Sequence, residues 1–352
     1  MNLYYSLSRL RHKLFLKNLE ILNKYGKIPP PHVVVWEATK QCNLACIHCG
    51  SLGDGQDLST KEIKDAIDQL AVLGVKHFQI TGGEPLVRYD LVEVLGYARQ
   101  QGLITSLASN GYSLNDHTAA ALSHAGVSSI QISIDGPKKV HNTIRQNDKS
   151  FDRAIEAIRS LKRNRNAKVV VATTVMPQNM GSLGALKDIL VSLQVDLWNM
   201  GTVMPVRNAL KDTGLFLSKS QFTALMAFII EAKKDLPVDM GENFPYLGSY
   251  DRKVRRHPRF CPVGLLYCCI GHDGTIRGCP DQPVGYEEGS LRDRSFKEIW
   301  NGGFERYRER RAVREDGKCR VCDESSDCAG GCWVMREHNM HCILDYDGAV
   351  DK

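Results

Sequence analysis

The sequence predicts an α/β protein: a six-unit partial (β/α)6 barrel of the TIM type, followed by a cysteine-rich domain stabilised by metal clusters. Three observations predict this. Strand-like and helix-like segments alternate from residue 32 to about 235, cysteine, glycine and proline become frequent after residue 260, and nine of the twelve cysteines lie there. Alternating segments favour a parallel sheet with helices on its outer face. With 352 residues, 43% of them hydrophobic, the chain can form one large domain and a smaller one.

The first domain is expected to contain six strands separated by helices. The strands are predicted at 33–37, 77–80, 105–109, 129–134, 168–175 and 198–203. Ser59-Thr60-Lys61-Glu62 is typical of a capping box that begins the first of the intervening helices. The other helices are predicted at 91–101, 116–125, 150–162, 180–192 and 218–232. In such a sheet, functional residues lie at the carboxyl ends of the strands.

Composition divides the chain into five segments. They are a basic amphipathic segment at 1–31, the barrel at 32–235, a basic linker at 236–259, the cysteine-rich domain at 260–345 and a tail at 346–352. The first segment is shorter than the ~40 residues that usually fold alone, so no separate N-terminal peptide-recognition domain is expected.

Leu7, Leu10, Leu14 and Ile21 recur at helical spacing in this first segment. Their common face either packs on the barrel, contacts a membrane surface, or covers the active site. Two further basic runs lie at 252–259 and around 306–314, and the first is interpreted as solvated surface. The first run could instead anchor an acidic substrate or an electron donor.

The chain shows neither a signal peptide nor an apolar run long enough to span a membrane. Twelve cysteines without a secretion signal indicate a reducing, cytoplasmic environment, where clustered cysteines are typical of metal or redox sites. The net charge of +6 favours no particular partner.

Three cysteines, Cys42, Cys46 and Cys49, follow directly on the first predicted strand. Four thiolates normally hold a cubic iron–sulfur cluster, and a structural zinc site also needs four protein ligands. Three thiolates would leave one iron with an open position, at which a small molecule can bind the metal. A zinc site is the alternative interpretation of the same residues.

The spacing Cys-x3-Cys-x2-Cys resembles the signature of the radical S-adenosylmethionine (radical SAM) enzymes. This resemblance implies a [4Fe–4S] cluster whose open iron binds SAM. An electron from the cluster cleaves SAM and leaves a 5′-deoxyadenosyl radical, which removes a hydrogen atom from a substrate carbon. The cofactor carries the difficult chemistry and the protein positions it.

Motifs after the later strands extend this resemblance, because they occur in the order that the family shows. The resemblance implies contacts with SAM from His48, in the place of the family's usual aromatic residue, and from the loop after the second strand. It also implies SAM contacts from residues at the ends of the third and fourth strands, and an arginine that pairs with the SAM carboxylate. These residues are Gly82, Gly83, Glu84, Pro85, Ser109, Asn110, Ser133 and Arg145.

The C-terminal cysteines resemble the SPASM domain of radical SAM enzymes that modify peptides and proteins. The pattern is Cys261-x12-Gly274-x4-Cys279, then Cys-x2-Cys-x5-Cys-x3-Cys and a final Cys342. The resemblance implies two auxiliary [4Fe–4S] clusters, and therefore three clusters in all. The expected ligands are Cys261, Cys268, Cys279 and Cys332 for the first, and Cys319, Cys322, Cys328 and Cys342 for the second.

Two residues of this region have open roles. Either Cys268 or Cys269 is the ligand, and the spacing from Cys261 favours Cys268. Cys269 is then a buried bystander or a hydrogen-atom donor. No general base is evident, because Pro280 follows Cys279 where the sulfatase-maturing branch has an aspartate; Asp281 is a weak candidate.

The predicted function is hydrogen-atom abstraction from a carbon of a ribosomally synthesised peptide. A peptide-modifying enzyme of this type would use a flavodoxin or ferredoxin as electron donor, and a separate protein could bind the leader peptide. The first alternative is the same chemistry on a small molecule, such as a tetrapyrrole side chain or an aminoglycoside-like alcohol. The second is a zinc-stabilised nucleic-acid-binding protein, supported only by the two basic runs.

Overall fold

The computed structural model describes residues 3–50, 55–164, 166–241, 246–255, 257–309, 317–340 and 342. The named strands of this part of the chain form one ten-stranded sheet in the order β10-β9-β8-β1-β2-β3-β4-β5-β6-β7. They are β1 (Val33–Glu37), β2 (His77–Thr81), β3 (Ile104–Ser109), β4 (Ser129–Ser133), β5 (Lys168–Val175), β6 (Leu197–Thr202), β7 (Val238–Met240), β8 (Tyr267–Ile270), β9 (Thr275–Arg277) and β10 (Gly289–Ser290).

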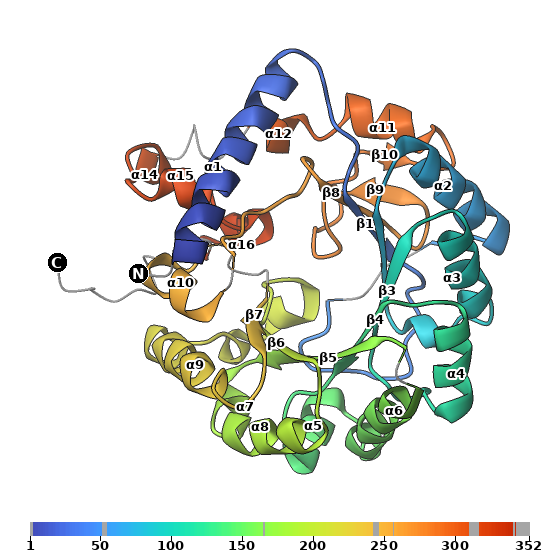
Figure 1. The fold of residues 1–352 in the computed structure, drawn as a ribbon, viewed down its shortest axis with the longest axis vertical. Coiled ribbons are helices and arrows are strands. Elements are labelled where there is room, and N and C mark those ends of the chain that lie inside the picture. The colour runs from blue at the N-terminus through green and yellow to red at the C-terminus, as the bar shows by residue number, and fades with distance from the viewer. Residues whose placement is uncertain are drawn as a thin grey trace.

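The six predicted strands are β1 to β6, and they lie side by side in chain order with parallel pairing. The sheet curves into an open barrel with its helices outside (Figure 1). This confirms the predicted α/β partial barrel. The carboxyl ends of the strands meet at one edge, where the loops that follow them can form a common site.

The sheet continues on both sides of these six strands. β7 pairs in parallel with β6, and β8 pairs in parallel with β1, with Val35 opposite Cys269. β7 lies in the segment predicted as a linker, and β8 to β10 lie in the cysteine-rich region. The predicted boundaries at 235 and 260 are therefore not edges of the sheet, and the two predicted domains share it.

The predicted helices are present, with small shifts at their ends. They are α2 (Thr60–Leu73), α3 (Leu91–Gln100), α4 (Asp116–His124), α6 (Ser150–Asn164), α8 (Leu183–Ser192) and α9 (Lys219–Ala232). Both halves of the predicted capping box are formed at Ser59 and Glu62. Two further helices were not predicted, α5 (Lys138–Arg145) and the short α7 (Pro177–Met180).

Alternation along the strands separates two environments. On β1, Val34 and Trp36 belong to the apolar core between sheet and helices, whereas Glu37 lies on the other side, in contact with Arg277. The same alternation places polar residues on the inner face of the barrel, where they are partly or fully exposed. These residues are Gln79, Ser106, Gln131, Ser133, Thr174 and Asn199.

The C-terminal region contains apolar packing that the sequence analysis did not predict. Its helices are α10 (Asp251–Val254), α11 (Phe296–Gly302), α12 (Glu305–Arg308), α14 (Gly317–Arg320), α15 (Ser325–Cys328) and α16 (Trp333–Glu337). Outside this region, the described chain has short 3-10 turns at Pro85–Val87, Arg207–Lys211, Thr213–Leu215 and Gly248–Tyr250. Phe296, Trp300 and Phe304 are fully buried, and a capping box at Ser295, which was not predicted, begins α11. This packing continues the barrel core, because both belong to one hydrophobic cluster.

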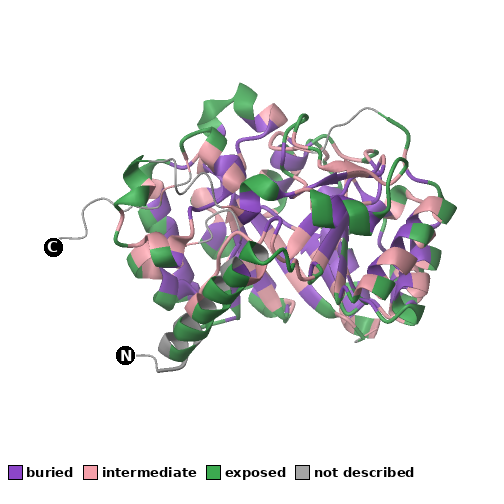
Figure 2. Cartoon of the chain, turned by 90° about the horizontal axis from the view of Figure 1, so that it is seen from above, coloured by how far each residue is buried: buried purple, intermediate pink, exposed green. Residues whose placement is uncertain are grey.

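The basic amphipathic segment forms helix α1 (Leu3–Lys24) along the outside of the molecule (Figures 1 and 2). Of the three alternatives for the face of Leu7, Leu10, Leu14 and Ile21, packing on the barrel is the one that the structure contradicts. These side chains are 46–60% exposed, and the helix instead buries Leu19. Lys13 forms an ion pair with Asp327 of α15, which attaches α1 to the cysteine-rich region.

One described stretch, Thr213–Ala232, is long and apolar enough to cross a membrane by length and composition alone. It contains α9, whose Phe222, Leu225 and Ile229 are buried in the core of the barrel. The buried side of a helix that packs on a sheet passes the same test of length and composition.

Candidate iron–sulfur and SAM site

The loop that carries Cys42, Cys46 and Cys49 leaves β1 at the carboxyl edge of the barrel. Cys46 is buried, Cys49 is half-buried and Cys42 is exposed. Burial raises the pKa of both Cys42 and Cys46, and the neighbouring Cys49 raises each further. The three thiols are therefore electrostatic neighbours, as ligands of a common group must be.

No group of three His, Cys, Asp or Glu side chains in the described part of the chain is arranged to hold a single metal ion. Three thiolates on one loop can each bind a different iron of a cubic cluster and leave the fourth iron open. The chemistry of the donor set therefore fits such a cluster.

Gly82 and Gly83 hold this loop against the end of β2. A Cβ on Gly83 would lie 2.2 Å from the carbonyl oxygen of Gln41, and one on Gly82 would lie 2.6 Å from that of Thr39. The amide of Gly83 also donates to the Thr39 carbonyl across 2.7 Å. The close approach that these glycines permit is thus to the backbone of the cysteine loop.

Glu84 connects this region with the end of β3. Its carboxylate accepts hydrogen bonds from the Ser109 hydroxyl (2.8 Å) and from the backbone amides of Asn110 (2.7 Å) and Leu86 (3.0 Å). Pro85 begins the turn that follows. Asn110 in turn donates to Oδ1 of Asn43 across 2.7 Å, within the cysteine loop. Glu84, Ser109 and Asn110 therefore support the loop, and Asn110 lies 3.8 Å from the Cys42 thiol.

Arg145, at the end of α5, is buried between an acid and a thiol. Its Nε donates to Oδ2 of Asp135 across 2.6 Å, and its Nη1 donates to Sγ of Cys46 across 3.6 Å. Burial raises the pKa of Asp135, but Arg145 and two nearby histidines outweigh this and hold it below its usual value. Asp135, which sequence reasoning did not assign a role, thus fixes the position of Arg145.

The two histidines each have a buried ring nitrogen without a hydrogen-bond partner, Nδ1 of His48 and Nε2 of His141. Burial lowers the pKa of both to about 4, against the opposing effect of Asp135. Both imidazoles are therefore neutral near pH 7. Both imidazoles are electrostatic neighbours of Asp135 and Arg145, and buried ring nitrogens without a partner are what a site for a polar cofactor would offer. Ser133, at the end of β4, is half-buried on the inner face.

The first predicted set of auxiliary ligands is partly assembled. Burial is the main cause that raises the pKa of Cys279, and the nearby groups of Asp281, Cys332 and Cys261 raise it further. The thiols of Cys261, Cys279 and Cys332 are therefore neighbours. Cys268, the fourth expected ligand, lies on the outer side of β8 in the apolar core, and its charged neighbour is Arg308.

The second predicted set is gathered around one residue. The pKa of Cys328 is raised to about 11, chiefly by burial and also by the neighbouring thiols of Cys342, Cys319 and Cys322. All four expected thiols are therefore neighbours. Arg336 donates from Nη2 to Sγ of Cys319 across 3.3 Å, which supplies a positive charge beside the group.

Cys269 lies on the inner side of β8, beside Cys268 but in a different environment. Its thiol is 3.9 Å from Oε2 of Glu37, and Glu37 forms an ion pair with Arg277. Asp281 is exposed to solvent but has many protein atoms around its carboxyl group. The resulting desolvation raises its pKa, and the positive charges of Arg207 and Arg277 only partly lower it again. Sequence analysis missed Glu37 and Arg277; a charged residue at the end of the β-branched first strand was the available signal.

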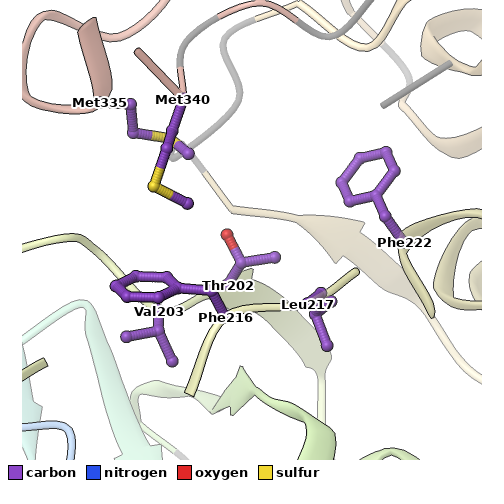
Figure 3. A pocket seen from close by; sticks show the side chains of 7 residues that line it. All are labelled: Thr202, Val203, Phe216, Leu217, Phe222, Met335 and Met340. Carbon is purple, nitrogen blue, oxygen red and sulfur yellow. The ribbon is translucent and has the colours of Figure 1, made fainter. Parts of the chain in front are cut away.

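The C-terminal domain reaches the carboxyl end of β6 at a small apolar recess of about 10 Å3. Met335 and Met340 lie over Thr202, Val203 and Phe216 at this point (Figure 3). This contact joins the predicted cluster domain to the open edge of the barrel, where the cysteine loop also lies.

In the described part of the two basic runs, three arginines are used in contacts within the protein. Arg255 is buried in an ion pair with Asp251, and Arg259 pairs with Asp239. Arg308 is buried and donates to three backbone carbonyls. Residue 256 and residues 310–316 lie outside the described part of the chain. Arg255, Arg259 and Arg308 therefore serve folding, which weakens the support of these runs for nucleic-acid binding.

The fold and the cysteine sites define the class of protein. Residues 36–189 match the radical SAM superfamily, and residues 261–328 match SPASM, an iron–sulfur cluster-binding domain. The chain is a radical SAM enzyme with a C-terminal SPASM domain, as the two resemblances predicted. This class requires a [4Fe–4S] cluster and SAM, and the SPASM domain indicates additional iron–sulfur binding.

Curated relatives extend over most of the chain. An AdoMet-dependent heme synthase of Oleidesulfovibrio alaskensis is 29% identical over 331 residues, covering 86% of this chain and 83% of the relative. The mycofactocin maturase MftC of Mycolicibacterium smegmatis is 29% identical over 314 residues, covering 87% of this chain and 79% of the relative.

Solved structures show the same fold at low identity. Streptococcus suis SuiB bound to S-adenosylmethionine has a TM-score of 0.71 at 17% identity, covering 89% of this chain and 76% of SuiB. The structure of anSMEcpe with bound AdoMet has a TM-score of 0.67 at 17% identity, covering 88% and 90% of the two chains.

Proposed function

We propose that Cys42, Cys46 and Cys49 hold a [4Fe–4S] cluster that binds SAM, and that the enzyme matures a ribosomally synthesised peptide. One observation carries this proposal. Three thiols, the buried Arg145 and two imidazole nitrogens without hydrogen-bond partners lie together at the carboxyl edge of the barrel. When bound, the cluster supplies the electron that cleaves SAM to the 5′-deoxyadenosyl radical, which takes a hydrogen atom from the substrate.

The residues around the thiols have separable roles in this proposal. Arg145 offers its guanidinium to the SAM carboxylate while Asp135 keeps it in place. His48 and Ser133 offer polar atoms to the rest of SAM. Glu84, with Ser109 and Asn110, supports the loop that Gly82 and Gly83 hold, so these residues act on SAM by positioning.

Two auxiliary [4Fe–4S] clusters complete the proposal. Cys319, Cys322, Cys328 and Cys342 hold one, which their mutual effect on Cys328 supports. Cys261, Cys279 and Cys332 hold the other together with Cys268. An auxiliary cluster beside the open edge of the barrel can accept an electron from a substrate radical, so the overall reaction can be an oxidation.

The inner face of the barrel supports a peptide as substrate. Its amide and hydroxyl side chains, exemplified by Gln79, Gln131 and Asn199, can donate to and accept from a polypeptide backbone. A flat tetrapyrrole macrocycle would need apolar surface instead. The similarity to a mycofactocin maturase agrees with this choice.

Chemistry on a tetrapyrrole side chain is the second candidate. The similarity to heme synthases, which is as high as that to the maturases, favours it. The positive charges of Arg207 and Arg277 act to lower the pKa of both Glu37 and Asp281, and the same charges could attract substrate carboxylates.

We further propose a cytoplasmic location, a flavodoxin- or ferredoxin-type electron donor and a separate protein that presents the leader of the precursor peptide.

Replacement of Cys46 tests the N-terminal site. Anaerobically reconstituted Cys46→Ala protein should produce no 5′-deoxyadenosine with SAM and dithionite, while the auxiliary clusters still assemble. The expected loss is about four iron atoms and four sulfides per chain. Cys269→Ala is the matched control and should keep all its iron. A Cys46→Ala protein that still cleaves SAM would refute the assignment.

The substrate class needs a separate experiment. The reconstituted enzyme is incubated with SAM, reductant and either a short precursor peptide encoded beside its gene or a carboxylate-bearing tetrapyrrole. The peptide proposal predicts a mass change in the peptide, with stimulated 5′-deoxyadenosine formation. A mass change confined to the tetrapyrrole would replace the peptide proposal by the second candidate.

A further inference from the structure

Helix α1 presents an apolar stripe to solvent that the fold does not use. At 3.6 residues per turn, Leu7, Leu10, Leu14 and Ile21 fall within an arc of about 60°. Each of them is 46–60% exposed. Figure 2 shows the exposed residues along the outer side of this helix. Exposed leucines scattered singly are normal, but four on one stripe mark an interaction surface.

Other sides of α1 contact the rest of the protein. The stripe is therefore exposed although the helix itself is packed on the molecule. Leu19 is buried, and Phe15 lies against Phe260 with ring centroids 6.3 Å apart. Lys13 pairs with Asp327 across 3.1 Å and donates to Ser326. These contacts orient α1 and leave the aliphatic stripe directed away from the barrel.

Basic residues border the stripe. By helical position Lys17 and Lys24 lie along one edge and Arg11 along the other, and all three are exposed. The sequence of α1 contains five basic residues and one acidic residue. Tyr25, which follows the helix, is 72% exposed in line with the stripe. A narrow aliphatic stripe with cationic edges is typical of helices that lie in a membrane interface.

We propose that α1 binds the surface of an anionic membrane, with its four aliphatic side chains inserted among the lipids and Arg11, Lys17 and Lys24 at the phosphate groups. The charges decide between this partner and a protein. Lysine is depleted in protein interfaces, whereas an anionic lipid surface attracts it. The proposal does not depend on the substrate of the enzyme.

The test uses the full chain with its clusters, floated under anaerobic conditions with vesicles of phosphatidylcholine alone or mixed with phosphatidylglycerol. Binding is expected to the mixed vesicles only and should weaken as salt rises. Leu7→Ser/Leu10→Ser/Leu14→Ser should reduce binding at least about tenfold. Val72→Ser/Val191→Ser/Val284→Ser, which changes exposed valines elsewhere, should not reduce it.

A second variant covers the case in which the triple serine change disturbs α1. Lys17→Glu/Lys24→Glu alters exposed charges only and should also abolish the preference for phosphatidylglycerol. SAM cleavage without substrate should be unchanged in each variant, which separates this test from that of the active site. Absence of vesicle binding by the unaltered enzyme overturns the proposal. So does a dimer, seen by light scattering, that the triple variant converts to monomers, because the stripe would then join two copies.

Discussion

The guanidinium of Arg145 contacts the thiol of Cys46, with 3.6 Å between Nη1 and Sγ. These residues lie 99 positions apart, at the end of α5 and in the loop after β1. Asp135 holds the same guanidinium from the other side. The group proposed to bind the SAM carboxylate is therefore already charged, buried and oriented before any cofactor binds.

Arg145→Ala is expected to destabilise the fold as well as to weaken SAM binding. It leaves the Asp135 carboxylate buried without its cation, which typically costs about 3–5 kcal/mol. Urea unfolding measures this loss. Asp135→Asn/Arg145→Ala should recover part of it, because no unpaired charge remains. Equal stability of the single and double variants would contradict the pairing.

Arg145→Lys separates affinity from stability. A lysine keeps the positive charge beside Asp135 but cannot form a bidentate pair with a carboxylate. We expect SAM affinity to fall by something like 1.5–3 kcal/mol, the contribution of a charged hydrogen bond. Calorimetric titration with SAM measures it, and an unchanged affinity would exclude Arg145 from the SAM site.

Gly83→Ala should disturb the cysteine loop through a purely steric effect. The new Cβ would overlap the Gln41 carbonyl, which is backbone and cannot rotate away. The expected loss of stability is about 1–3 kcal/mol, with reduced iron content at the N-terminal site. Gly96→Ala is the matched control, because a Cβ at this position in α3 meets nothing within 4 Å. It should be neutral or stabilise by about 0.5–1 kcal/mol.

Serine replacement of each neighbouring cysteine distinguishes ligand from bystander on β8. Cys268→Ser should lose one auxiliary cluster, about four iron atoms per chain, if it completes the first set. Cys269→Ser should keep its iron, because that thiol faces Glu37 on the inner side of the strand. Iron and sulfide analysis gives the answer, and the opposite pattern would assign Cys269 as the ligand.

His141 predicts a pH dependence of stability. Burial lowers its pKa from 6.5 to about 4. Between these values the unfolded chain binds a proton that the folded chain does not, so stability rises with pH and is lost as the pH falls below 6.5. The contribution of His141 should reach about 1.4 kcal/mol per pH unit, and His48, whose pKa burial also lowers to about 4, adds a second one. His141→Gln should therefore remove one of the two contributions, whereas His117→Gln, at an exposed position, should remove neither.

The sequence predicted the elements whose signals are local. The β-branched runs at β1 and β5, the capping box at Ser59 and the apolar period of α9 each occur within a few residues. The cysteine spacings are equally local, and they indicate the class of enzyme independently of the fold. Local spacing restricts which side chains can reach one metal group, so it contains chemical information by itself.

Contacts between distant segments were decided only by the tertiary structure. β7 and β8 were not predicted as strands, because three or four residues become a strand only when a sheet edge pairs with them. Likewise, the Lys13–Asp327 attachment of α1 and the Asp135–Arg145–Cys46 contacts depend on segments that the chain sequence separates. Periodicity predicts that a helix has an apolar face, but not whether other elements cover it, and for that reason the exposure of the α1 stripe could not be read from the sequence.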